Sequence, residues 1–326
     1  MEPGSSGSGQ MPASSNRPEG WERQVLERLA LAAVVEQRRS RRWGVFFKLL
    51  TFVYLFALLF IAMGWMSKRD ASPNRHTAMI EIRGVIAAKS EASADNIVAA
   101  LQEAFKDKRT QGVVLRINSP GGSPVQAGHI NEEIRRLRAK HPEIPVHAVI
   151  EDICASGGYY IAAAADKIYV DKASLVGSIG VLMDGFGFTG TMEKLGVERR
   201  LLAAGTNKGF LDPFSPANPE QTAYAKTMLG EIHEQFIKIV REGRGDRLKE
   251  TPDTFSGLVW TGERSIAMGL ADAFGTVDYV AREVIKAEEI VDFTPRENIA
   301  ERVAKRFGAA SAEALVRSIG QGTAIR

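Results

Sequence analysis

Val146–Ala165 has the sequence VHAVIEDICASGGYYIAAAA. Val146–Ile150 has the pattern of a strand, and Ser156–Ala165 is predicted to be a short helix of small residues. A second buried-strand pattern, Gly112–Ile117 (GVVLRI), ends in the turn NSPGG at Asn118–Gly122. Strands that lead through glycine-rich turns into helices predict an α/β domain, with helices packed on a largely parallel sheet.

Segments on both sides of this stretch continue the alternation. Further strands are expected at Ala78–Ile82 (continued by Val85–Ile86), Lys167–Val170 and Ile179–Met183. Helices are expected at Ala94–Lys106, Val125–Arg138, Ala217–Arg241 and Val277–Ala287, and one more is expected to end at Leu270–Asp272.

The composition excludes several classes of protein. The 326 residues are 44% hydrophobic and 25% charged, which is typical of a folded chain and excludes disorder throughout. A single cysteine excludes a disulfide scaffold and a cysteine-rich zinc site. A net charge of only +3 provides no global field for nucleic acid. We therefore expect no nucleic-acid partner.

The net charge belongs to the N-terminal segment. Residues 1–48 hold eight basic and five acidic side chains, so they account for the whole +3. The next residues, Leu49–Met66, carry no charge, and Trp43–Phe47 extends the apolar run upstream. The pattern predicts a transmembrane helix over 44–66, in preference to a buried core helix or a cleaved signal peptide.

The flanks of this segment predict its orientation. Four arginines at 38–42 precede the apolar run, so the positive-inside rule places residues 1–43, a flexible and basic segment, in the cytoplasm. Residues 67–77 are then a linker, and the rest of the chain lies across the membrane.

Ser156 has the setting of an exposed nucleophile, because it stands at a glycine-flanked turn between a strand and a helix. Gly157 lets the backbone approach a substrate carbonyl, and the helix N-terminus favours an oxyanion. The two glycine-rich turns can each supply one amide donor, as acyl transfer requires. The alternative is a tight turn in which Ser156 only caps the helix.

The base that activates Ser156 is not evident from local pattern. A surface or packing role is favoured for each of the five histidines, His76, His129, His141, His147 and His233. A lysine is the other option, because burial can make the amine neutral and basic. Lys208 lies in a loop with few charges, AAGTNKGF at Ala203–Phe210. Cys154 has an alternative interpretation as a thiol nucleophile, but a small buried residue is favoured.

Several motifs occur together in a characteristic order: NSPGG at Asn118–Gly122, SGGYY at Ser156–Tyr160, GSIGV at Gly177–Val181, the Gly205–Lys208 loop, WTG at Trp260–Gly262 and GLAD at Gly269–Asp272. Over roughly residues 77–290 the chain resembles the short, single-domain form of signal peptide peptidase A, a serine–lysine protease family. The resemblance implies a ClpP/crotonase-like α/β fold, with a peptidase domain over 78–290 and a helical tail over 291–326.

The resemblance also implies a role for each matching residue. Ser156 corresponds to the nucleophile and Lys208 to the general base, while Ser178 corresponds to the serine that orients the lysine amine. Gly122 and Gly157 correspond to the two oxyanion donors. The implied mechanism needs no cofactor and no metal.

The implied function is a membrane-anchored serine endopeptidase with a Ser–Lys dyad that degrades cleaved signal peptides. Its implied location is the bacterial inner membrane, with a periplasmic catalytic domain. The resemblance further implies a homo-oligomeric ring in which Ser156 of one copy meets Lys208 of the next. The alternatives are a crotonase-like acyl-CoA enzyme, which would bind CoA thioesters, and a non-catalytic membrane scaffold, whose Ser156 would not react with serine-directed reagents.

Overall fold

The computed structural model describes residues 31, 37, 39, 41–59 and 74–295. The chain divides into two units, residues 1–71 and 72–326. The described part of the first unit includes the helix Arg41–Leu59, which is long and apolar enough to cross a membrane. Its 19 residues span about 28 Å, close to the thickness of a bilayer's hydrocarbon core. The expected span continues to residue 66, but 60–66 lie outside the described residues.

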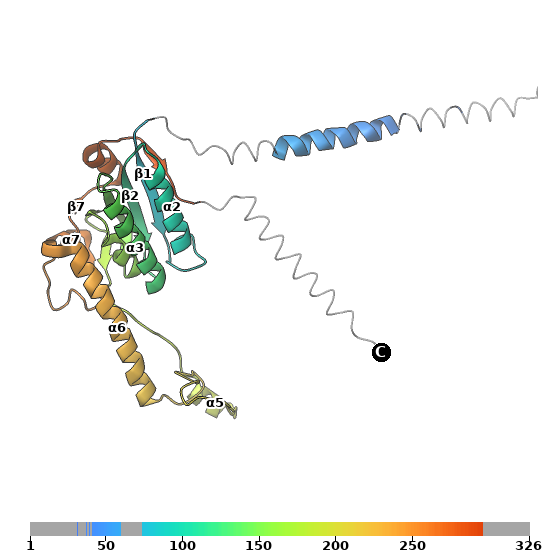
Figure 1. Ribbon diagram of the computed structural model, residues 1–326. Coiled ribbons are helices and arrows are strands. Elements are labelled where there is room, and N and C mark those ends of the chain that lie inside the picture. The colour runs from blue at the N-terminus through green and yellow to red at the C-terminus, as the bar shows by residue number, and fades with distance from the viewer. Residues whose placement is uncertain (1–30, 32–36, 38, 40, 60–73, 296–326) are drawn as a thin grey trace, which may run out of the picture. The chain divides into compact units, whose positions relative to one another are not determined.

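The second unit is built on a sheet whose central strands are parallel (Figure 1). Along one path the strand order is β6-β5-β3-β2-β1-β8. The strands on this path are β1 (His76–Arg83), β2 (Thr110–Ser119), β3 (Val146–Ala155), β5 (Leu175–Gly177), β6 (Val259–Thr261) and β8 (Ile290–Asp292). Because β1, β2 and β3 are parallel, their carboxyl ends meet at one edge of the sheet, where ligands and catalytic groups of α/β proteins collect.

The sheet forks beside β3. The first half of β3 pairs with β4 (Lys167–Val170), which in turn pairs with β7 (Ala273–Phe274). The second half, at Ile153–Ala155, pairs with β5, and β5 pairs antiparallel with β6. The carboxyl end of β3 therefore lies between β2 and β5, which both help to position the turn that follows it.

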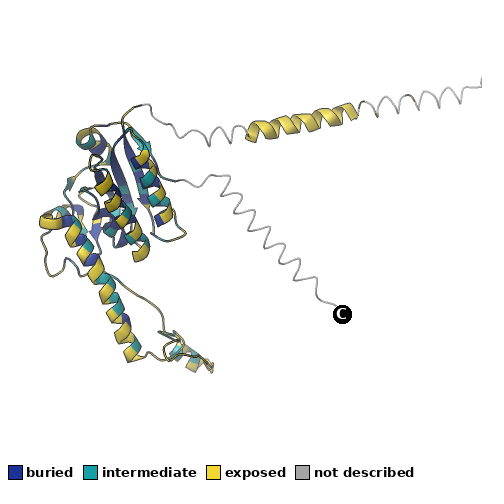
Figure 2. Ribbon diagram, viewed as in Figure 1, coloured by how far each residue is buried: buried dark blue, intermediate teal, exposed yellow. Residues whose placement is uncertain are grey.

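Side chains of the central strands alternate between two buried faces. Val113, Leu115 and Ile117 of β2 belong to the main core, which is covered by α2 (Ala94–Lys106) and α3 (Pro124–Lys140). Val114 points to the other face, where it packs with Val149, Tyr169 and Val280. Figure 2 shows the strands buried and the helices exposed along their outer faces. The remaining elements of this body are α4 (Gly157–Ala162), α7 (Gly262–Ala267), α8 (Val277–Tyr279), the 3-10 turn η1 (Gly245–Arg247) and the π-helical turn η2 (Val280–Ile285).

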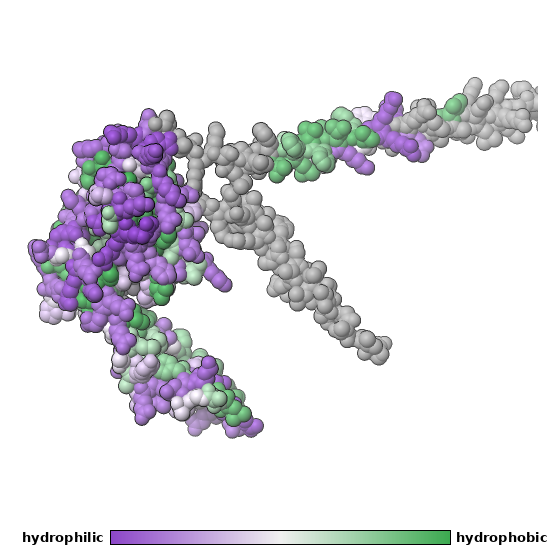
Figure 3. All heavy atoms as spheres, viewed as in Figure 1, coloured by the Kyte–Doolittle hydropathy of each residue, from purple (hydrophilic) through white to green (hydrophobic). Residues whose placement is uncertain are grey.

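A long helix carries an arm away from this body. Helix α6 (Pro219–Arg244) packs on the core mainly through its C-terminal part, where Phe236, Ile237 and Val240 are buried. Residues 181–218, which we call the arm, include α5 (Thr189–Lys194) and lie beside the opposite end of α6 (Figure 1). The arm exposes many large apolar side chains, and Figure 3 shows hydrophobic residues on its surface. The most exposed are Leu182, Phe186, Leu195 and Leu202.

Most predicted elements are confirmed, including α2 and β4 with their expected limits. Two predictions are wrong. Ile179–Met183 is not a strand, because Ser178 has a φ of 51° and its amide bonds to Leu258, so the chain leaves the sheet at that point. Leu270–Asp272 does not end a helix, because α7 stops at Ala267. The helical tail expected over 291–326 stays a prediction, because 296–326 lie outside the described residues; its first two residues belong to β8.

Candidate active site

Ser156 links the end of β3 to the start of α4. Its backbone has φ 51° and ψ −121°, a region that non-glycine residues rarely occupy. The amide of Ser156 donates to the carbonyl of Gly177 at 2.8 Å, and its carbonyl accepts the first helical bond from Tyr160 at 3.0 Å. The side chain makes no capping hydrogen bond, which argues against the simple N-cap interpretation. The hydroxyl of Ser156 is therefore not occupied by the helix, and the residue that carries it has a strained backbone.

The NSPGG turn lies directly against this serine. A Cβ placed on Gly121 would stand 2.7 Å from the Ser156 Cβ and 2.8 Å from the Gly157 nitrogen. A Cβ placed on Gly157 would stand 3.3 Å from the Gly122 nitrogen, so the backbones of Gly122 and Gly157 are neighbours. Ile86 fixes the turn from the other side, because its amide donates to Gly121 and its carbonyl accepts from Ser123. The structure thus brings together Ser156, Gly122 and Gly157 of the five residues predicted for the site, and a fourth, Ser178, lies next to them.

Ser178 stands beside Ser156 at the end of the neighbouring strand. Ala155 and Gly177 are register partners at the ends of the adjacent strands β3 and β5, and Ser156 and Ser178 are the residues that directly follow them. Ser178 is half-buried, and its amide donates to the carbonyl of Leu258 at 2.7 Å. Its position is compatible with a hydroxyl that orients a group entering the site.

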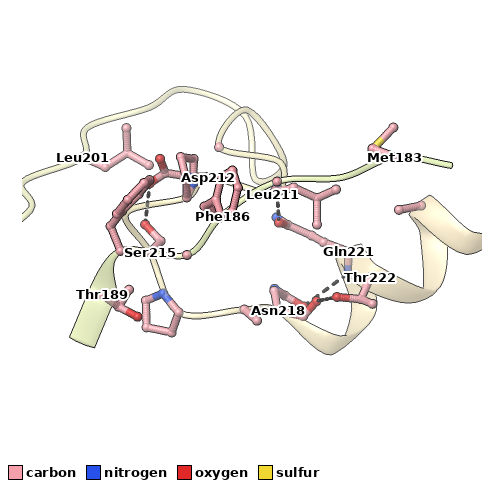
Figure 4. Close-up of a pocket in the computed structure, with 18 of the residues that line it drawn as sticks. Met183, Phe186, Thr189, Leu201, Leu211, Asp212, Ser215, Asn218, Gln221 and Thr222 are labelled. Carbon is pink, nitrogen blue, oxygen red and sulfur yellow. Dashed lines mark hydrogen bonds between the residues drawn. The ribbon is translucent and has the colours of Figure 1, made fainter. Parts of the chain in front are cut away.

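Lys208 is not part of this cluster within one chain. It lies in the arm, in a turn closed by a bond from its own amide to Gly205. The arm is fastened to the first turns of α6, where the Leu211 amide donates to the Gln221 side chain at 3.1 Å (Figure 4). The cavity beside Ser156 is lined by Ile232 of α6, which lies about 16 Å along the helix from Gln221, where the arm is attached. The side chain of Lys208 is exposed.

A cavity of about 380 Å³ opens next to Ser156. Its walls are largely apolar, and its floor includes Tyr160 and Phe236, whose ring centroids are 5.1 Å apart. Two polar groups on α3, His129 and Glu132, also line it. Neither was predicted as a site residue, although Val125, His129 and Glu132 are spaced at i, i+4 and i+7, which places them on one helical face directly after the NSPGG turn.

A second hollow, of about 1250 Å³, lies within the arm and its junction with α6 (Figure 4). It is larger than the cavity beside Ser156, but neither Ser156 nor Ser178 lines it. We locate the candidate chemistry at the smaller cavity, because that cavity combines a free hydroxyl with neighbouring backbone amides.

The other histidines with described contacts have packing roles. His76 is buried and stacks on Phe293, while His141 packs against Phe105. The His233 ring forms a 3.1 Å hydrogen bond with the carbonyl of Ile179. The buried His147 contacts Tyr169 edge to face, and burial lowers its pKa. Only His129 among the five lines the Ser156 cavity.

Cys154 is a buried core residue. It has no exposed surface, and burial raises the pKa of its thiol far above the usual range. Since the thiolate is the nucleophilic form, Cys154 is poorly suited to attack a substrate. The described residues contain no group of three or more acidic, histidine or cysteine side chains arranged to hold a metal ion.

The GLAD motif supports the helix that follows Ser156. Leu270 accepts a 2.7 Å hydrogen bond from the hydroxyl of the buried Tyr159. Asp272 accepts two 2.9 Å bonds from the buried Arg244 and one of 2.7 Å from the amide of Ile168. Burial raises the pKa of Asp272, but the bonds and charge of Arg244 outweigh burial and lower it overall. The motif therefore fixes α4, α6 and β4 to one another.

Comparisons with known proteins are consistent with this geometry. Residues 138–291 match the family model of peptidase family S49. A protein of Enterococcus faecium named "Putative signal peptide peptidase SppA" is 27% identical over 233 residues, which cover 69% of this chain and 67% of that protein. A Methanocaldococcus jannaschii protein named "Putative protease MJ0651" is 33% identical over 203 residues, covering 61% of this chain and 64% of that protein.

A further relative has a different name. A Brucella melitensis protein named "Na(+)/H(+) antiporter NhaA" is 48% identical over 175 residues, or 54% of this chain. The chain spans only 24% of that relative's length, so most of the protein with that name lies outside the match.

The fold, the Ser156 turn and these matches together support a serine peptidase. The match of residues 138–291 to the peptidase family S49 model and the relatives named as signal peptide peptidase and protease confirm the expected resemblance to the signal peptide peptidase A family.

Proposed function

We propose that the chain is a membrane-anchored serine endopeptidase with Ser156 as its nucleophile. The observation that carries the proposal is the free hydroxyl of Ser156, held in a strained turn beside the backbones of Gly122 and Gly157 and opening on a cavity. The Ser156 hydroxyl would attack a peptide carbonyl, and the amides of Gly122 and Gly157 would stabilise the oxyanion.

Lys208 is the proposed general base. Its neutral amine would take the proton of Ser156 and later protonate the leaving amine, after which water would release the acyl-enzyme. Ser178 would orient that amine from its place beside Ser156. This mechanism needs an amine in a site from which water is excluded, whereas Lys208 is exposed in the single chain.

We propose that a second copy of the chain supplies this lysine. The arm that carries Lys208 lies apart from the Ser156 cavity of its own chain, and its exposed apolar residues suit burial against another copy. Leu182, Leu195 and Leu202 are 79%, 71% and 97% exposed, respectively. A homo-oligomeric ring in which each arm reaches the next copy would bury these side chains and place Lys208 in a dry site.

The proposed substrates are apolar peptides, in particular cleaved signal peptides. The apolar walls of the Ser156 cavity support this proposal, as does the name of the Enterococcus relative. The helix Arg41–Leu59 supports a single-pass anchor, and the arginines before it support a cytoplasmic N-terminus. The peptidase domain, proposed over residues 78–290, would then lie on the periplasmic side of a bacterial inner membrane.

A mixing experiment tests the shared dyad. Ser156→Ala and Lys208→Ala are each expected to abolish hydrolysis of a signal-like peptide, with Lys194→Ala, an exposed lysine of the same arm, as the control. Co-expressed Ser156→Ala and Lys208→Ala chains should regain part of the activity, because some interfaces would pair an intact Ser156 with an intact Lys208. No recovery in mixed oligomers would place both groups in one chain, and full activity of Lys208→Ala would remove Lys208 from the mechanism.

A further inference from the structure

A basic groove lies at the edge of the sheet opposite to Ser156. It has a volume of about 820 Å³ and forms where the C-terminal ends of α2 and α3 meet the start of β2. Its exposed cations are Arg75, Lys106, Lys108, Arg136 and Lys140, against only two acidic lining residues, Asp107 and Glu143.

Four of these cations form no ion pair within residues 74–295. Arg136 is paired with Glu133, and Asp107 is neutralised by Arg109, which does not line the groove. The other four, Arg75, Lys106, Lys108 and Lys140, have no ion-pair partner among the described residues. Lys106 and Lys140 are the last residues of α2 and α3, where the negative end of the helix dipole stabilises a cation. That role does not explain Arg75 or Lys108, which lie outside helices.

The groove is also the place where the chain arrives from its N-terminal segment. Arg75 lines the groove and directly precedes β1, while the described part of the apolar helix reaches Leu59. The chain between Leu59 and Arg75 can reach at most about 54 Å, so its length sets an upper limit on the distance between Arg75 and the described end of that helix. Glu143 and Ile144, also in the lining, precede β3, whereas Ser156 follows it. The ten residues of β3 separate the two sites by about 33 Å.

We propose that this groove binds anionic phospholipid headgroups of the membrane that anchors the chain. The inference rests on the anchor proposed above. Lys and Arg side chains near an anionic bilayer are attracted to it, and each is worth about fivefold in association. Docking would hold the tethered edge of the sheet on the bilayer and turn the Ser156 cavity away from it. A peptide would then have to extend about 30 Å from the headgroups before Ser156 reached it.

The test uses the full chain in lipid nanodiscs of phosphatidylcholine, with or without 30% phosphatidylglycerol. A donor dye on Ala139→Cys, an exposed position next to Lys140, reports the distance to an acceptor on lipid headgroups. Native Cys154 is buried, and a Cys154→Ala background removes it. We expect higher energy transfer in anionic discs, lost at 0.5 M NaCl, where charges are screened within a few ångströms.

The triple variant Lys106→Glu, Lys108→Glu, Lys140→Glu should lose the difference between the two kinds of disc, with a drop of about 100-fold or more in the equilibrium constant for docking. The matched control, Lys89→Glu, Lys238→Glu, Lys286→Glu, has the same net charge but changes exposed lysines elsewhere. It should keep most of the difference. Equal transfer in neutral and anionic discs, or equal loss in both triple variants, would overturn the proposal.

The readout also separates this proposal from the peptidase assignment. Energy transfer needs no turnover, so an inactive protein that docks on anionic discs would support the groove and count against the enzyme. A full chain that does not enter nanodiscs would overturn the anchor and the groove together, while leaving hydrolysis by Ser156 to be measured in solution.

Discussion

The backbone N–H of Ser156 donates a 2.8 Å hydrogen bond to the carbonyl of Gly177. This bond fixes the turn after β3 to the end of β5, in register with the pairing of Ala155 and Gly177. It holds Ser156 at a φ of 51°, a conformation that costs a non-glycine residue about 1–3 kcal/mol. The site therefore stores strain in the residue that is proposed to react.

Replacement of Ser156 should reveal this strain. Ser156→Ala and Ser156→Gly both remove the hydroxyl, and both are expected to be inactive. Only glycine relieves the backbone strain, so we expect Ser156→Gly to have the higher free energy of unfolding, by about 1 kcal/mol. Urea denaturation of the two variants measures the difference. A glycine variant that is less stable than the alanine variant would show that the turn is not strained.

Gly121 tests the contact between the two turns. A methyl group on Gly121 would lie 2.7 Å from the Cβ of Ser156, at a φ of 101°, so the turn must move. We expect Gly121→Ala to fold but to lose about 100-fold or more in kcat, because displaced amides no longer meet the oxyanion. Gly230→Ala on α6, where a methyl group contacts nothing, is the control. Normal kcat in Gly121→Ala would argue against an oxyanion site at this turn.

The buried ion pair between Arg244 and Asp272 should matter for stability. Asp272→Asn leaves Arg244, which is 1% exposed, without its counter-charge, and we expect a loss of about 3–5 kcal/mol. The exposed pair of Arg241 and Glu250 is the comparison, since Glu250→Gln should cost at most about 1 kcal/mol.

The same pair predicts a pH dependence. The pKa of Asp272 is lower in the folded chain than its ordinary value of 3.8, so the folded state favours the carboxylate. Its contribution is complete above pH 4 and is lost as the pH falls through the lowered folded pKa. The stability gap between wild type and Asp272→Asn should therefore narrow below pH 4, as urea denaturation at several pH values can measure. A gap that is constant down to pH 2 would contradict the assignment.

The central strands and helices could be predicted from sequence because their pattern is local. Strands are clearly indicated by the apolar runs that precede NSPGG and ASGGYY. A helix is indicated by the periodic apolar face of Ala94–Lys106. The Ile179–Met183 segment misled the prediction for a physical reason. Its apolar residues resemble a strand, but Leu182 and Met183 are exposed on the arm, where no other described residue covers them.

The candidate site was predictable in part for the same reason. Ser156, Gly122 and Gly157 lie in turns that directly follow paired strands, so parallel pairing alone brings them together. That His129 lines the cavity could not be predicted, because tertiary packing decides which face of α3 borders the cavity. Lys208 lies in an arm whose large apolar side chains are exposed among the described residues, so its local sequence does not define its surroundings.

Cys154 offers a direct test of the serine assignment. It is the only cysteine of the chain, and its burial and raised pKa protect it from thiol reagents. We expect no labelling of the native protein at pH 8, labelling after denaturation, and full activity in Cys154→Ala. Rapid labelling of the native protein accompanied by inactivation would instead support Cys154 as the nucleophile.

His129 is the one histidine positioned to compete with Lys208 as the base. It lines the cavity together with Ser156, so in a mechanism confined to one chain it would be the histidine placed to act as the base. We expect His129→Ala to keep kcat within about tenfold of wild type and to change mainly KM, because the side chain borders the space that a substrate would fill. A fall in kcat to the level of Ser156→Ala, measured at several pH values, would transfer the role of base from Lys208 to His129.

The arm should govern assembly. Leu202 is 97% exposed in the single chain, and burying a leucine side chain is worth about 1.5–3 kcal/mol, or roughly ten- to a hundredfold in association. Leu202→Asp is therefore expected to shift the purified full chain toward smaller species in light scattering, with a parallel loss of activity and little change in thermal unfolding. Lys208→Ala should keep the size of wild type while losing activity, which separates chemistry from assembly. If Leu202→Asp retained both the size and the activity of wild type, the arm would not be the interface, and the lysine that serves Ser156 would have to reach it by another route.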